Sequence, residues 1–299
     1  MMNERKLGMA AAIGCYVFWG VLPIYWKQLE GAAGAYEILA HRMIWSFVFM
    51  LFVLYGGKLF PRFRETVKEL WENKRKGVLM LAASALITMN WLIFIWAVNH
   101  DRIVESSFGY YINPLFSVVL GILFFRERLS RGKWLAMFIA LAGISYMTWQ
   151  MGRLPLISIG LAGTFGLYGA AKKKLGLNPF VSITLETLLA LPVAFWFALT
   201  PMEGMTPQFG SGSTAVTALL VGAGVVTALP LLLFSIGANR LPLNVLGFCQ
   251  YLSPSLSLLL AVFLYGEPFT ADEGISFSFI WAALILFTAA DFRENQRKK

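Results

Sequence analysis

The sequence has few charged residues and few of the side chains that carry out chemistry in enzymes. Charged types make up 14% of the 299 residues, and there are two histidines and two cysteines. It contains no Gly-rich phosphate loop ending in Lys-Ser/Thr, no H-E-x-x-H pair and no G-x-S-x-G elbow. These absences argue against an ATP-driven pump, a metalloenzyme or another enzyme. They give no reason to expect a metal or any other cofactor.

What the chain has instead is apolar surface. Hydrophobic types make up 58% of the residues and the mean hydropathy is +0.66, more than a water-soluble domain of this size buries. Cys15 and Cys249 both fall inside apolar runs, so we expect reduced, buried thiols and no disulfide framework. The composition therefore predicts an integral membrane protein.

Long apolar runs recur along the chain. A helix needs about 20 residues to cross about 30 Å of hydrocarbon. Ten runs fit this length, at 7–26, 36–55, 78–98, 103–125, 134–150, 154–171, 179–200, 214–238, 241–266 and 275–290. The runs are continuous and do not alternate polar with apolar residues, which disfavours a β-barrel. The fold class is thus an all-α polytopic membrane protein with ten transmembrane helices.

The net charge of +9 does not indicate nucleic-acid binding, because the cations form short clusters between apolar runs. Lysines and arginines are enriched in cytoplasmic connections. Placing both termini in the cytoplasm puts most of the basic clusters there, at 5–6, 58–76, 126–133, 172–174, 240 and 293–299. We therefore predict a multi-pass protein of the inner membrane of a prokaryote, with a basic cytoplasmic tail at 291–299.

The longest connection, 56–77, combines basic and acidic residues with regularly spaced apolar ones. Phe60, Phe63, Val67, Leu70 and Trp71 have the spacing of one helix face. This pattern predicts an amphipathic helix on the inner leaflet, its cations near anionic headgroups, and a solvated helical linker is the alternative.

The second half of the chain repeats the first. A shift of 140 positions aligns Tyr111 with Tyr251, Pro114 with Pro254 and Glu127 with Glu267, and a shift of 146 aligns residues 13–27 with 159–173. Residues 7–150 and 154–290 thus form two similar units of five helices. Because five is odd, the two units have opposite orientations in the membrane. Inverted repeats of this kind are typical of transporters that work by alternating access.

Several strings in this chain carry a family resemblance. They are W-G at 19–20, P-x-Y-W-K at 23–27, E-I-L-A-H-R at 37–42, N-W at 90–91, G-Y-x-x-N-P-L at 109–115 and E-R-L at 127–129. The chain resembles the EamA-type branch of the drug/metabolite transporter superfamily over essentially its whole length, and within it the RarD group, labelled chloramphenicol-sensitive proteins. The resemblance implies ten helices, a central cavity open to one side at a time, and transport of metabolites or drugs without ATP hydrolysis.

Polar residues inside the spans are the candidate site, because lipid penalises them unless they face a cavity or a partner. Tyr110 and Asn113 lie on one helix face, and the repeat places Gln250 opposite them. Asn90 is a candidate hydrogen-bonding cavity residue, Trp91 a packing residue and Trp19 a candidate aromatic wall. Hydrogen bonding between helices is the alternative role for the polar groups. The expected substrate cavity comprises Trp19, His41, Arg42, Asn90, Tyr110, Asn113, Glu186 and Gln250.

Charges within the spans are the second feature of this candidate site. His41 and Arg42 lie in the second helix of the first half, and Glu186 lies at the corresponding position of the second half. We expect Arg42 and Glu186 either to pair or to face a wet cavity, and Glu186, assisted by His41, to exchange protons. Pro114 and Pro254 should kink their helices, because each removes a backbone donor.

The sequence thus predicts a secondary transporter, an exporter of small organic molecules, driven by protons or by an exchanged solute. The alternatives are a flippase that moves an amphiphile or lipid-linked substrate between leaflets, and a membrane-embedded transferase. The transferase is disfavoured because the connections are mostly too short to hold catalytic groups. Substrate identity and oligomeric state do not follow from the sequence.

Overall fold

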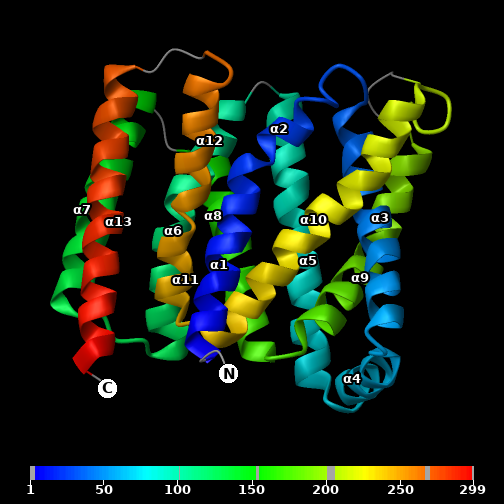
Figure 1. Cartoon of the computed structure of the whole chain (residues 1–299), viewed down its shortest axis with the longest axis horizontal. Coiled ribbons are helices and arrows are strands. Elements are labelled where there is room, and N and C mark those ends of the chain that lie inside the picture. Colours follow the sequence, from blue (N-terminus) through cyan, green and yellow to red (C-terminus); the bar gives the residue numbers. More distant parts are fainter. Residues whose placement is uncertain (1–3, 101, 153–154, 201–205, 267–269, 298–299) are drawn as a thin grey trace.

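The computed structural model describes residues 4–100, 102–152, 155–200, 206–266 and 270–297, which fold into α-helices and their connections. The helices are α1 (Glu4–Val21), α2 (Pro23–Trp26), α3 (Ala35–Gly56), α4 (Phe60–Glu72), α5 (Lys74–Asn99), α6 (Ile103–Phe125), α7 (Arg131–Met151), α8 (Leu156–Leu175), α9 (Pro179–Leu199), α10 (Thr214–Arg240), α11 (Leu243–Cys249), α12 (Leu252–Phe263) and α13 (Ala271–Arg297). The start of α1, the end of α13 and helix α4 lie at the same end of the bundle (Figure 1), called here the α4 end. The opposite end is called the far end.

Eight segments of the described residues are long and apolar enough to cross a membrane. They are α1 with α2, α3, most of α5, most of α6, α9, α10, α11 with α12, and most of α13. Helices α7 and α8 have 21 and 20 residues, so they are also long enough at 1.5 Å per residue. Three lysines in the last turn of α8, and aromatic and polar residues at the end of α7, lower their hydropathy.

Prolines divide two of the expected spans. The first span is interrupted before Pro23, where α2 begins, and the ninth is divided into α11 and α12 by a turn at Gln250 and Tyr251. Pro254 has no N–H to donate to the Gln250 carbonyl four residues earlier, and that carbonyl instead accepts from Ser253 N at 3.1 Å. Pro114, in contrast, lies inside α6 without interrupting it. Of the two prolines expected to kink their helices, Pro254 lies next to an interruption and Pro114 does not.

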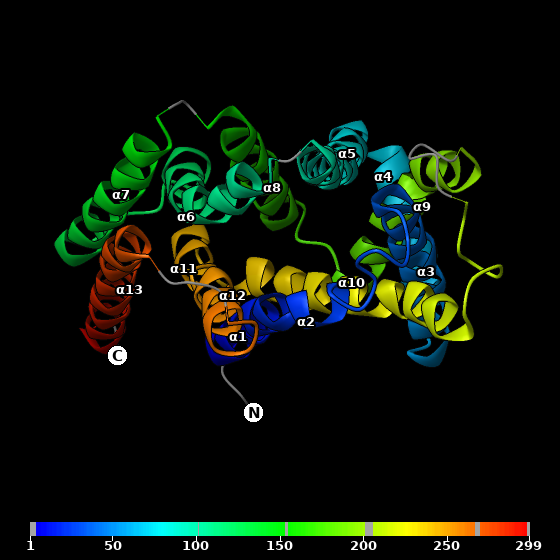
Figure 2. The same ribbon diagram turned by 90° about the horizontal axis from the view of Figure 1, so that it is seen from above.

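Seen along the helices, the bundle has two rows (Figure 2). One row contains α7, α6, α8 and α5, and the other contains α13, α12, α1 and α10, with α3 and α9 at one end. The rows are joined where α7 packs on α13 and α6 on α11, while α3 packs on α9. Within the rows, α5 and α6 pack on α8, just as α10 and α12 pack on α1.

Helices α3 and α10 meet backbone to backbone, which fixes the position of the side chains beside the contact. A Cβ atom on Gly224 would lie 2.2 Å from the carbonyl carbon of Trp45, so only glycine permits this approach. Ser46 Oγ donates a hydrogen bond to the Gly224 carbonyl at 2.9 Å. Arg42 lies one turn before Ser46 on α3, Thr227 lies one turn after Gly224 on α10, and their side chains face each other.

The main hydrophobic core lies in the half of the bundle nearest the α4 end. Its buried members come from the α4-end halves of the long helices, for example Met50 and Leu54 of α3, Val118 of α6 and Leu185 of α9. Toward the far end the buried apolar residues form three smaller, separate clusters, around Leu39, Phe108 and Leu29. The helices are therefore packed together most continuously at the α4 end.

Candidate functional site

Arg42 is held between three helices, about 10 Å from the far end of α3. It is the eighth residue of α3, and each residue adds about 1.5 Å. Its Nε donates a hydrogen bond to Thr227 Oγ1 at 3.0 Å, and its guanidinium carbon lies 4.8 Å from the ring centre of Trp26 and 5.6 Å from that of Trp91. Arg42, Trp26 and Trp91 are all partly accessible. A charge at this depth is therefore surrounded by aromatic faces and still reachable.

Tyr110 extends this surface onto α6. Its side chain is close enough to Arg42 for an electrostatic interaction, and its ring centre is 6.4 Å from that of Phe94 on α5. Tyr110 is 49% exposed, although it lies seven residues inside α6, at about the depth of Arg42. We call Trp26, Arg42, Trp91, Tyr110 and Thr227 the Arg42 site.

His41, although adjacent in sequence, is not part of the Arg42 site. Its ring stacks on Phe209 with centroids 4.4 Å apart, and its Nδ1 is 3.2 Å from the donor Nε1 of Trp45. Glu37, one turn earlier, accepts hydrogen bonds from the backbone N–H groups of Gln208 and Phe209 at 2.8 and 2.9 Å. This buried histidine thus helps to hold the connection before α10 against α3.

Glu186 is buried in a polar cluster in the half nearest the α4 end. Lys172 Nζ lies 2.5 Å from Glu186 Oε1, which also accepts from Ser182 Oγ at 2.9 Å, while Tyr168 Oη donates to Oε2 at 2.7 Å. The exposed fractions of Lys172 and Glu186 are only 2% and 3%. We call Tyr168, Lys172, Ser182 and Glu186 the Glu186 cluster. Its members come from α8 and α9.

Pairing of Arg42 with Glu186 is one of the two alternatives expected from the sequence, and the described residues do not show it. Both residues lie seven positions after the first residue of their helix, but α3 and α9 run in opposite directions, so Arg42 is near the far end and Glu186 near the α4 end. The separation along the bundle is about 10 Å or more at 1.5 Å per residue. Lys172, which the sequence pattern places in a connection, instead lies inside α8 and is the cation beside Glu186.

Aromatic side chains pack against the Glu186 cluster. Trp19 is partly accessible and contacts Phe165 and Phe234, with ring centres 5.6 and 6.1 Å apart. Phe234 in turn stacks on Tyr168 at 5.7 Å, and Tyr168 binds Glu186. Trp19 therefore belongs to an aromatic group that reaches the hydrogen-bond partner of Glu186.

The three amides of the candidate site fall into two groups. Asn90 Nδ2 donates to the Leu161 carbonyl and to Thr164 Oγ1, both at 2.9 Å, so it joins α5 to α8. Asn113 and Gln250 are buried, and their side-chain carbonyl oxygens have no hydrogen-bond partner among the described residues. Orphan acceptors of this kind are rare in native structures and call for an explanation. The structure thus divides the expected residues into an accessible set (Trp19, Arg42, Asn90 and Tyr110) and a buried one (His41, Asn113, Glu186 and Gln250).

The α4 end is also held together by charged contacts between the two halves of the chain. Glu127, after α6, accepts from the backbone N–H groups of Leu243 and Asn244 at 2.6 and 2.9 Å, at the start of α11. Further ion pairs join α1 to α10 and α13, and α7 to α13; they are Glu4–Arg240, Arg5–Asp291, Lys133–Asp291 and Lys133–Glu294. Together with the main core, these contacts close this end of the bundle.

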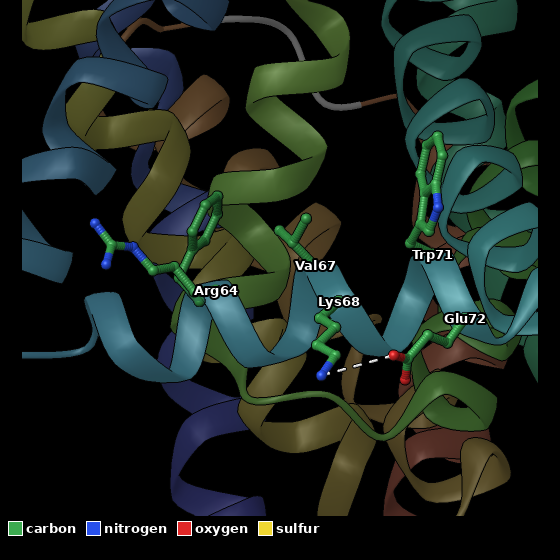
Figure 3. A pocket seen from close by; sticks show the side chains of 6 residues that line it. Arg64, Val67, Lys68, Trp71 and Glu72 are labelled. Carbon is green, nitrogen blue, oxygen red and sulfur yellow. Dashed lines mark ion pairs between the residues drawn. The ribbon is translucent and has the colours of Figure 1, made fainter.

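A groove of a different kind runs along α4. It is lined by Phe63, Arg64, Val67, Lys68, Trp71 and Glu72, all from this one helix (Figure 3). Lys68 and Glu72 pair at 3.8 Å, and Trp71 is 87% exposed. The opposite face of α4 carries Leu70 and the buried Thr66, and Phe63 of the groove also packs against the main core. The groove is therefore an open surface of an amphipathic helix at the α4 end.

Sequence reasoning misses six residues of these sites. It gives no role to Trp26, Tyr168, Ser182 or Thr227, and it assigns Trp91 to packing and Lys172 to a connection. Periodicity within one helix does not show which residues of other helices face Arg42. The run of lysines at 172–174 is a signal for the end of α8, because all three lie in the last turn of that helix.

Comparison with known proteins agrees with this architecture. The sequence profile of the EamA-like transporter family matches residues 6–149. The chain is 44% identical to the uncharacterized transporter YojE of Bacillus subtilis, covering 99% of this chain and 98% of that protein. It is 41% identical to Protein RarD of Escherichia coli, covering 95% of each. A solved crystal structure with 16% identity covers 96% of this chain and 97% of its own, with a TM-score of 0.72, and shows the same fold.

The bundle has eight apolar candidate spans, and Arg42 is partly accessible among aromatic side chains inside it. Together with 44% identity to a bacterial transporter over nearly the whole chain, these features define a multi-pass membrane transporter. The chain belongs to the EamA-like transporter family, and within it to the RarD-like drug/metabolite transporters. Membership implies a small-molecule substrate and a lipid environment.

Proposed function

We propose that this chain is a secondary transporter that exports small organic molecules by alternating access, through ten spans arranged as two inverted repeats. The pattern of helix packing supports the repeat. Each helix of the first half has a counterpart in the second half: α1 and α8, α3 and α9, α5 and α10, α6 and α11 with α12, and α7 and α13. If each helix is exchanged with its counterpart, every major helix–helix contact becomes another contact that is present. For example, α1 on α10 becomes α8 on α5. An experimental structure in which these pairings fail would rule out the repeat.

Helices α7 and α8 complete the ten spans in this proposal. Helix α8 packs between α5 and α6, so its lysines need not meet lipid. Helix α7 packs along α13, a candidate span of similar length. Both helices extend over the height of the bundle in Figure 1. With ten spans, the polypeptide begins and ends on the same side of the membrane.

The observation that carries the transport proposal is the unequal packing of the two ends. The main core and the charged contacts lie at the α4 end, whereas the accessible Arg42 site lies nearer the far end. A molecule reaching Arg42 would therefore enter from the far end, while the α4 end is closed. Alternating access requires a second state with this relation reversed.

The α4 end is the cytoplasmic side in this proposal. Helix α4 carries exposed cations beside the exposed Trp71, a combination suited to an anionic leaflet surface. Most of the other basic clusters also lie in segments at this end. The structure would then be open to the outside of an inner membrane.

Cysteine labelling tests this orientation. In a background with Cys15 and Cys249 replaced by Ala, Ser211→Cys should react with an impermeant maleimide on intact cells. Lys68→Cys should react only after the membrane is permeabilised, because α4 faces the cytoplasm. Both positions are exposed, so the two variants control for each other. Labelling of position 68 and protection of position 211 on intact cells would reverse the topology.

Transport itself is tested at the two orphan amides. Asn113→Leu and Gln250→Leu should lower uptake into proteoliposomes at least about tenfold, because each removes a polar group that we assign to the transport path. The solute is one selected by its thermal stabilisation of the purified wild type. Stability should stay nearly unchanged, since an unpaired buried carbonyl contributes little.

Asn90→Leu is the matched control. Its amide is already bonded to α8, so its replacement should cost about 1–3 kcal/mol of stability by removing two hydrogen bonds between α5 and α8. Wild-type uptake in both the Asn113 and the Gln250 variants would assign these amides to packing. Failure of the wild type to move any solute that stabilises it would contradict the proposed function.

A further inference from the structure

Among the described residues, no acidic side chain pairs with Arg42. No carboxylate of the described residues lies within ion-pair distance of it, and the groups around its guanidinium are a hydroxyl, two indoles and a phenol. An arginine in the interior of a membrane-spanning helix is costly unless it has a partner or faces a cavity. The two buried lysines of the described residues, Lys133 and Lys172, both pair with an acidic residue. Arg42 is thus an exception within its own structure.

The free hydrogen-bond donors of Arg42 point to a planar acceptor. A guanidinium has five N–H groups, and only the one on Nε is used, by Thr227 Oγ1. The four on the two terminal nitrogens have no acceptor among the described residues. These two nitrogens form the fork that binds both oxygens of a carboxylate in parallel. Thr227 holds the guanidinium at Nε and leaves the two terminal nitrogens free to bind a ligand.

The aromatic groups define what accompanies the acceptor. Trp26 and Trp91 place ring faces 4.8 and 5.6 Å from the guanidinium carbon, and Tyr110 with Phe94 continues the aromatic surface toward α5 and α6. Their partial exposure means that these rings are open to contact. Indole and phenol rings favour an apolar or aromatic body next to the bound charge.

We propose that the Arg42 site binds the carboxylate of an organic acid, with the apolar body of that acid against Trp26, Trp91 and Tyr110. This assignment rests on the proposed transport function and adds the class of substrate. One guanidinium among neutral neighbours matches a monoanion, so a carboxylate is favoured over a dianionic phosphate ester. A cation is repelled, and a neutral solute leaves the charge of Arg42 uncompensated.

The test compares an acid with its neutral counterpart on the detergent-purified protein. The probes are 3-phenylpropionate, octanoate and phenyl phosphate, with 3-phenylpropionamide and octanamide as the uncharged partners. A carboxylate of this panel should raise the melting temperature in a saturable way. Its amide should bind at least about tenfold more weakly, the factor expected for one charge-assisted hydrogen bond. Phenyl phosphate should be weaker than 3-phenylpropionate.

Variants then assign the effect to Arg42. Arg42→Gln should weaken carboxylate binding about 10- to 100-fold and abolish the preference for acid over amide. Arg42→Lys keeps the charge without the fork, and Thr227→Val removes the group that orients it, so both should give intermediate losses. Arg64→Gln, on the exposed face of α4, should bind as the wild type does. Thr227→Val and the acid–amide comparison in the wild type keep the test decisive if Arg42→Gln fails to fold.

Several outcomes would overturn the assignment. They are absence of binding by any carboxylate of the panel, equal binding of acid and amide by the wild type, and an acid preference that persists in both Arg42 variants. If the proposed transport function is wrong, the result is different, because carboxylates would then bind through Arg42 and yet not cross proteoliposome membranes. Transport of only neutral solutes would leave the function intact and remove the assigned substrate class.

Discussion

Lys172→Met should lower the free energy of unfolding by about 3–5 kcal/mol, the range for breaking one partner out of a buried ion pair. Glu186, 3% exposed, would keep its hydrogen bonds from Tyr168 and Ser182 but lose the ammonium 2.5 Å away. Thermal unfolding of the purified protein, or its denaturation in mixed micelles, measures the change. The effect is large because Glu186 is buried and its charge would be left uncompensated.

Two further variants show whether the loss comes from the unpaired charge. Lys172→Met combined with Glu186→Gln replaces the pair by neutral groups of similar shape, and it should recover most of the lost stability. Lys174→Met, two residues later on an exposed position, should change stability by less than about 0.5 kcal/mol. A double variant as unstable as the single one would show that packing around Lys172, and not charge, determines the cost.

The sequence predicted the helical membrane fold because apolar runs of span length are an unambiguous signal. It also placed a helix in the 56–77 connection, where α4 lies, from the spacing of its apolar residues. Hydropathy predicted the ends of the spans less accurately than their existence. The α8 helix continues through Lys172, because a lysine can enter the interior when a carboxylate such as Glu186 meets it, and hydropathy does not detect such pairs.

The candidate site could be predicted only in part, for a geometric reason. Choosing polar residues within spans identified Arg42, Tyr110 and Glu186, but the partners of each residue lie on other helices. The neighbours of Arg42 come from α2, α5 and α10, so no repeat distance along the chain connects them. Arg42 and Glu186 do not pair, one of the two expected alternatives, because each lies seven residues after the start of its helix while α3 and α9 run in opposite directions.

We propose that Glu186 exchanges a proton during the transport cycle, with Lys172 as its neutralising partner in the present state. Residues of both halves of the chain contact it, since Ser84 Oγ of α5 donates to the Glu186 backbone carbonyl at 3.0 Å. Phe165 and Phe234 pack on the Tyr168 ring of the cluster. Opening of the α4 end would part these contacts and expose the carboxylate to the cytoplasm. His41 packs on Phe209 and is not part of this cluster. A role for His41 in proton exchange therefore stays a separate prediction.

Replacing the ion pair by neutral groups separates coupling from structure. The Lys172→Met, Glu186→Gln double variant should fold and still exchange labelled for unlabelled solute across proteoliposome membranes, because the Arg42 site and the packing of the α4 end are kept. It should lose accumulation driven by a pH gradient, since glutamine cannot release a proton. Uptake with and without an imposed gradient, on the same vesicles, measures both properties. His41→Gln serves as the comparison and should keep gradient-driven uptake if Glu186 alone carries the proton. Full gradient-driven accumulation by the double variant would instead make the Glu186 cluster a structural ion pair, and the energy for transport would have to enter at another site.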